Sequence, residues 1–83
     1  MKIVKISDAI NAHKYFTDIE SKNPIYNLAY EILCTIKIAL ELKQLYELSL
    51  VDKSEDIESI TIAIRSMIKN YNMILHSECD FIL

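Results

Sequence analysis

The chain contains no glycine and one proline among its 83 residues, and this constrains the fold more than any other feature. Glycine is the residue that adopts the positive φ values of tight turns at least cost. A multi-stranded sheet built from hairpins normally uses several glycines. We therefore expect few, long elements joined by short polar links. The same absence argues against a phosphate-binding loop, in which glycine lets the backbone approach the phosphate closely.

The first helix is expected over residues 8–21. Ser7 is a suitable N-cap, Asp8 suits the positive end of the helix dipole, and Ile6 stands where a hydrophobic staple would pack. The apolar face of this helix is expected to consist of residues that recur at helical spacing: Ala9, Ile10, His13, Phe16 and Ile19.

A second helix is expected to begin at Pro24, with Asn23 as its cap, and to run to about residue 50. Such a helix is roughly 40 Å long. Its main apolar face is expected to comprise Ile25, Leu28, Ala29, Ile32, Leu33, Ile36, Ala39 and Leu40. In its second half Ile38, Leu42 and Leu45 lie on nearly the opposite side. These three residues, here called the apolar strip, indicate a helix that is central or lies in an interface.

A third helix is expected over residues 55–76, after a turn at residues 52–55. Asp52 and Glu55 have the spacing of a capping box, and Ser54 is an alternative cap. The predicted helix carries the most sustained amphipathic stripe in the chain. The stripe consists of Ile57, Ile60, Ile64, Met67 or Ile68, Tyr71, Ile74 and Leu75.

A strand interpretation competes with the third helix. Residues 59–64 alternate with a period of two and are rich in β-branched side chains, which is typical of a strand. Residues 2–6 and 80–83 also resemble short strands, so an α+β fold is the alternative. We favour helix because the stripe continues for five turns and no turn signal brackets residues 59–64. The expected fold is all-α: one domain over residues 1–83, forming a small three-helix bundle with a long central helix.

The composition favours association with another molecule. Apolar residues make up 52% of the chain, which is more than the modest core of so short a domain easily hides. The net charge of −3 does not indicate nucleic-acid binding, and no recognition motif accompanies Lys2, Lys5 and Lys14. An acidic chain is better suited to a protein partner with a basic surface.

The two cysteines, Cys34 and Cys79, are expected to be free thiols with a packing role. The N-terminal segment has no long apolar run, so no secretory signal is expected. The longest apolar region, residues 25–51, is interrupted by charges, so no membrane span is expected. These features together predict a cytoplasmic protein that does not interact with membranes.

No catalytic, metal or cofactor site is predicted. His76 and Cys79 have the spacing of a metal-ligand pair, but a zinc site needs three or four ligands. A catalytic thiolate is disfavoured for Cys34, in an apolar helix, and for Cys79, between two carboxylates. His76 follows Arg65 by eleven residues, so the Arg–His spacing of a helical type of RNase is missing. We expect a protein that is not an enzyme.

The candidate partner-binding residues fall into three groups, each with an alternative interpretation. Tyr26 and Tyr30 are one helical turn apart and pack either in an interface or at the edge of the core. The apolar strip is either an interface or a contact with the third helix. The third group is acidic, and its alternative role is to complement the helix dipole and maintain solubility. It consists of Asp52, Glu55, Asp56 and Glu58.

The leading hypothesis is therefore a small, non-enzymatic inhibitor of the immunity-protein or antitoxin type. It would act by direct protein–protein contact on a partner with a basic surface. We expect a homodimer or a stable partner complex that buries the second face of the long central helix. The alternative is a regulatory or adaptor protein, of the kind that phages and plasmids encode, docking on a host enzyme. A nucleic-acid-binding or metal-binding module is less favoured than either.

Overall fold

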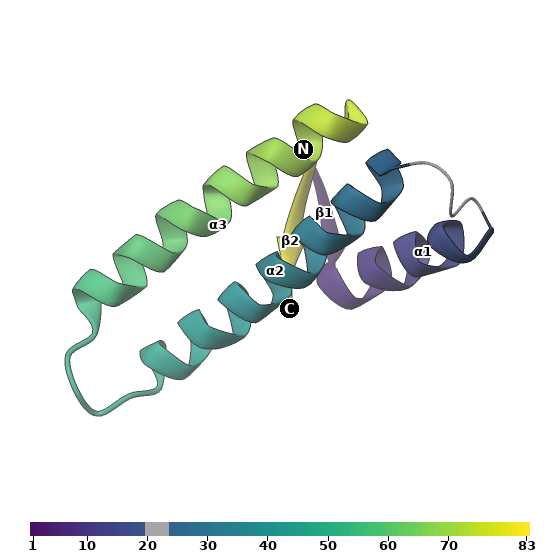
Figure 1. Cartoon of the computed structure of the whole chain (residues 1–83). Coiled ribbons are helices and arrows are strands. Elements are labelled where there is room, and N and C mark those ends of the chain that lie inside the picture. The colour runs from purple at the N-terminus through teal and green to yellow at the C-terminus, as the bar shows by residue number, and fades with distance from the viewer. Residues whose placement is uncertain (20–23) are drawn as a thin grey trace.

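The computed structural model is that of a mostly helical protein in which two short strands at the chain ends pair with each other (Figure 1). It describes the backbone of residues 1–19 and 24–83 and the side chains of residues 1–14 and 24–83. The elements in chain order are β1 (Lys2–Lys5), α1 (Ile6–Ile19), α2 (Pro24–Glu47), α3 (Ser54–Leu75) and β2 (Cys79–Ile82).

The helices α1 and α2 lie where the sequence predicts them but differ at their ends. Helix α1 begins at Ile6, directly after β1, so the prediction of a Ser7 cap with a staple at Ile6 is wrong. Ile6 is instead a fully buried helical residue. Helix α2 ends at Glu47, about three residues earlier than expected. The predicted cap at Asn23 and the predicted end of α1 at residue 21 lie outside the described residues.

Helix α3 begins one residue before its predicted start, and its predicted capping box is wrong. The N-cap residue is Lys53, which makes no side-chain capping hydrogen bond. The Oδ1 atom of Asp52 accepts a hydrogen bond from the backbone N–H of Ser54 at 3.0 Å, which forms a local turn instead. Lys53 Nζ also lies 5.5 Å from the ring centroid of Tyr46, a cation–π contact across the turn between α2 and α3.

The strands correct the all-α prediction at both ends of the chain. β1 and β2 pair in parallel, with Val4 opposite Phe81. Parallel strands need a crossover connection, and here all three helices form it. The end segments that the sequence offered only as alternative strands are therefore strands. Residues 59–64 lie inside α3, so the helical interpretation is confirmed there.

The molecule is elongated, with extents of 45 × 20 × 20 Å. Its radius of gyration is 13.8 Å, whereas about 12 Å is expected for a compact chain of this length. Helices α2 and α3 lie side by side and set the long axis. The turn between them forms one end of the molecule, α1 lies toward the other, and the strands lie between (Figure 1).

The core is concentrated around the strands. Its buried members come from every element except β1, whose Val4 packs against it half-buried: Ile6, Ala9, Ala29, Leu33, Ile36, Tyr71 and Phe81. The predicted main face of α2 is correct at its centre but wrong at its start, where Ile25 and Leu28 are 48% and 47% exposed. No residue from 37 to 63, a stretch that the structure describes throughout, is buried. We call residues 37–63 the distal hairpin.

A buried polar contact joins α1 to α3 inside this core. His13 Nε2 lies 2.8 Å from the hydroxyl oxygen of Tyr71, within hydrogen-bond distance. The Tyr71 ring meets the Phe81 ring edge-on at 5.1 Å between centroids, so this contact extends to β2. Burial lowers the pKa of His13 below its ordinary value of 6.5 and raises the pKa of Tyr71 to about 12. Among the described residues, His13 Nδ1 finds no hydrogen-bond partner.

The stripe of α3 gives a matched test of the fold, because Ile64 is 6% exposed and Ile62 is 60% exposed. Ile64→Asp buries an unpaired charge and is expected to cost at least about 3 kcal/mol, a large part of a small domain's stability. Ile62→Asp, two residues away, is expected to cost about 0.5 kcal/mol or less. Urea unfolding followed by circular dichroism measures both. Equal losses in the two variants would contradict the burial pattern.

The buried His13 predicts that stability depends on pH. Because the folded-state pKa lies below 6.5, the unfolded state binds more protons as the pH falls below that value. The free energy of unfolding is therefore expected to be greatest above about pH 6.5 and to decrease as the pH falls through 6.5, levelling off below the lowered pKa.

Urea unfolding of wild type and variants across this pH range tests the assignment to His13. His13→Gln is expected to flatten the dependence whatever its own stability, whereas the control His76→Asn keeps it. Asn suits this control because His76 has a left-handed backbone, with φ of 51°, a conformation that Asn tolerates. A dependence that survives in His13→Gln would show that another group causes it.

Candidate protein interaction surface

The apolar strip is exposed. Ile38 and Leu45 are each 64% exposed, and Leu42 is 38% exposed. The cause is the rotation of about 100° per residue along a helix, which turns Ile38 away from the core once Ile36 is buried. The alternative interpretation was that the strip is buried in contact with α3. Ile38 and Leu45 are exposed, so the structure does not show that burial for them.

The apolar surface continues past the end of α2. Leu48, Leu50 and Val51 are all exposed and lie in the segment between α2 and α3. They were missed as surface candidates because the sequence prediction extended the helix to residue 50. Leu48, Leu50 and Val51 are 75%, 105% and 66% exposed, so they extend the apolar surface of the distal hairpin.

The acidic group lies at the same end of the molecule as the apolar strip. Asp52, Glu55, Asp56 and Glu58 are all exposed and surround the start of α3. Hydrogen bonds from the backbone N–H of Ser54 and then from its hydroxyl lower the pKa of Asp52. This carboxylate is therefore held in its charged form, which favours contact with a positively charged surface.

The two tyrosines do not belong to this surface. Tyr26 and Tyr30 lie in the first two turns of α2, and both are half-buried. The Tyr26 ring is 6.5 Å from the His13 ring, at the edge of the core. Twelve residues separate Tyr26 from Ile38, which is roughly 18 Å along a helix. The apolar strip and the acidic group therefore both lie in the distal hairpin, whereas the tyrosines lie outside it.

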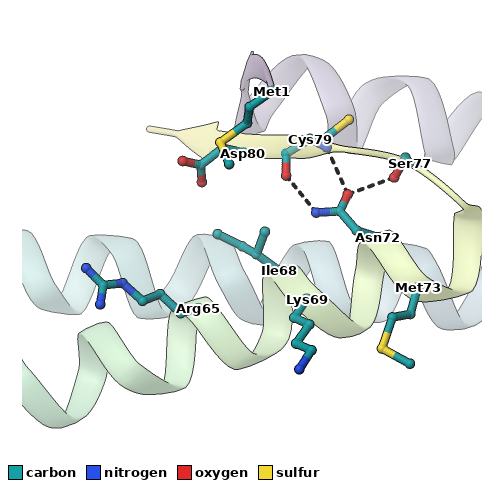
Figure 2. Close-up of a pocket in the computed structure, with 9 residues that line it drawn as sticks. All are labelled: Met1, Arg65, Ile68, Lys69, Asn72, Met73, Ser77, Cys79 and Asp80. Carbon is teal, nitrogen blue, oxygen red and sulfur yellow. Dashed lines mark hydrogen bonds between the residues drawn. The ribbon is translucent and has the colours of Figure 1, made fainter.

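A groove of about 550 Å³ lies between α3 and the paired strands, and the sequence analysis did not foresee it (Figure 2). The groove forms because β2 lies back against α3, and no local sequence pattern predicts that contact. Its lining residues are Met1, Arg65, Ile68, Lys69, Asn72, Met73, Ser77, Cys79 and Asp80.

The side chain of Asn72 fixes one wall of this groove. Its Nδ2 donates to the carbonyl oxygen of Cys79 at 2.8 Å, and its Oδ1 accepts from the backbone N–H of Cys79 at 2.9 Å. The Ser77 hydroxyl also donates to Oδ1, at 2.7 Å. Asn72 therefore occupies the outer edge of β2 at Cys79 and ties that strand to α3. This role is structural and offers no reactive group to a ligand.

Among the described residues, no three His, Cys, Asp or Glu side chains lie close enough together to hold a metal ion. Cys34 and Cys79 are both free and half-buried. Of the described helices, none has the length and apolar character needed to cross a membrane.

Comparison with known proteins identifies no relative of this chain. No protein family model, no curated protein and no solved structure matches the chain.

Proposed function

We propose that this chain is a small, non-enzymatic inhibitor of the immunity-protein or antitoxin type, which binds its target protein through the distal hairpin. The observation that carries the proposal is the exposure of the apolar strip on a stretch that has no buried residue of its own. Burying one Leu or Ile side chain contributes roughly 1.5–3 kcal/mol. Three such side chains with Leu48 beside them therefore supply the apolar centre that a stable interface needs.

The charges around the apolar strip support a partner with a basic surface. The acidic group lies at the turn end of the distal hairpin, which also carries the strip, whereas Lys37 and Lys43 are each paired with a glutamate on α2. An acidic rim around an apolar centre accelerates association with a basic partner and disfavours acidic ones. A basic active site, such as that of an enzyme acting on nucleic acid, has the complementary character. An inhibitor that covers such a site needs no catalytic residue.

Leu45→Glu tests the proposal against the matched control Leu28→Glu. Both residues lie on α2 and are exposed, but Leu28 lies at the opposite end of the helix. With the tagged chain expressed in its native cell, we expect one stoichiometric protein partner, whose activity the purified chain blocks. Leu45→Glu is expected to weaken that complex about ten- to a hundredfold by removing the burial of one side chain, and Leu28→Glu to leave it intact.

Three results would contradict the proposal. They are the absence of any stoichiometric partner, equal loss of binding in the two variants, and a partner whose activity the bound chain leaves unchanged. The last result would favour the adaptor alternative, because binding without inhibition is what a docking protein shows. Circular dichroism of both variants verifies that the helices remain folded.

A further inference from the structure

The outer face of α3 carries acidic residues in its first half and basic residues in its second half. Glu55, Glu58, Ile62, Arg65 and Lys69 are spaced by three or four residues, so they lie along one face of the helix. All five side chains are exposed. Lys69 extends away from β2, in the opposite sense to Ile68 (Figure 2). The face lies away from the core, and its Arg65 and Lys69 also border the groove beside the strands.

The order of charges along this face is complementary to its own reverse. Glu58 precedes Ile62 by four residues and Arg65 follows it by three, while Glu55 and Lys69 each lie seven residues away. If a second copy of the face is turned end to end about Ile62, each glutamate meets a cation. Symmetric dimers need a surface of this kind, because a two-fold axis places the same patch on both sides of the interface.

The interactions within one chain do not account for this order. Among the described residues, the ion pairs are those that join Lys37 to Glu41 and Lys43 to Glu47 on α2, and none involves the four charged residues on this face of α3. Like charges three or four residues apart on a helix repel each other. The helix dipole favours an acid in the first turn, which explains Glu55, but its influence fades beyond that turn. Glu58, Arg65 and Lys69 therefore have no ion-pair partner among the described residues of their own chain.

The ends of the face fit the same arrangement. Met73 is 65% exposed and follows Ile62 by eleven residues, while Val51 is 66% exposed and precedes it by eleven. An antiparallel copy therefore places Met73 of one chain near the turn that holds Val51 of the other. Apolar side chains would then meet at the centre and at both ends, with opposite charges between them.

We propose that a second copy of this chain docks antiparallel on the outer face of α3, with the two-fold axis at Ile62. Glu58 then faces the partner's Arg65, and Glu55 faces the partner's Lys69. Glu55 and Glu58 then belong to the dimer, so the acidic rim of the proposed function reduces to Asp52 and Asp56, and the apolar strip is not used in this interface. Because one helix pair forms a small interface, the dissociation constant is expected to be on the order of 10–100 µM.

A charge exchange between Glu58 and Arg65 tests this geometry. Analytical ultracentrifugation of the whole chain at low salt measures the dimer dissociation constant of wild type, Glu58→Arg, Arg65→Glu and the double variant. Each single variant places like charges opposite each other at two symmetric positions and is expected to weaken the dimer at least about tenfold. The double variant restores both contacts and is expected to return within about threefold of wild type. The control Glu78→Arg makes the same charge change on an exposed residue outside α3 and is expected to have no effect.

The outcomes separate this proposal from the proposed function. A wild-type chain that stays monomeric at 1 mM, single variants that dimerise normally, or a double variant that is not restored would each overturn the α3 dimer. If Leu45→Glu abolishes dimerisation and Glu58→Arg does not, the second copy docks on the apolar strip, and the α3 dimer is again wrong. If the charge exchange behaves as expected while no target protein binds, the dimer stands and the inhibitor function fails.

Discussion

The pairing of the two chain ends is the contact on which the rest of this structure depends. β2 returns to lie beside β1, and Phe81 thereby enters the core against Tyr71. Tyr71 in turn meets His13 on α1, so a single connected set of rings joins the first helix, the third helix and the last strand. Asn72 secures the same strand through both backbone groups of Cys79. Without β2, the core would lose Phe81 and Tyr71 would lose its ring contact with it.

This arrangement places the buried residues on one side of the molecule's midpoint and leaves the distal hairpin thinly packed. Helix α2 continues for eleven residues beyond Ile36. Its second half has α3 beside it, and residues 81–83 approach Leu40, Lys43 and Gln44, while Ile38 and Leu45 stay exposed. The exposed Ile38, Leu45 and Leu48 follow from that geometry. Exposed apolar side chains in this number are costly in solution, and a protein partner relieves that cost. The long axis of the fold and the proposed binding role therefore have one physical origin.

Much of the helical structure was predictable from the sequence, because helix formation leaves a periodic pattern that extends over many residues. The stripe on α3 predicts that Ile64 and Tyr71 face inward, and both are buried.

The strands were named only as alternatives, since four-residue segments carry little local signal and their pairing joins residues 77 positions apart. The sequence left two alternatives for the apolar strip, an interface or a contact with the third helix, and the exposure of Ile38 and Leu45 agrees with the first. The groove between α3 and β2 was not foreseen, because it exists only once the strands have paired. The core role of His13 was foreseen, but its contact with Tyr71 joins residues 58 positions apart and leaves no trace in either helix alone.

Hydrogen exchange of the dilute, unbound chain tests the central claim most directly, which is that the fold is secured near the strands and thinly packed at the distal hairpin. Backbone amides of residues 64–71 on α3 and of 29–36 on α2 are expected to exchange only through global unfolding, since they surround the buried rings. Amides of residues 42–47 and 57–61 are expected to exchange at least about tenfold faster, through local opening of the hairpin end. Equal protection along the whole of α2 and α3 would contradict the account, because the distal hairpin would then be stable without any partner to cover it.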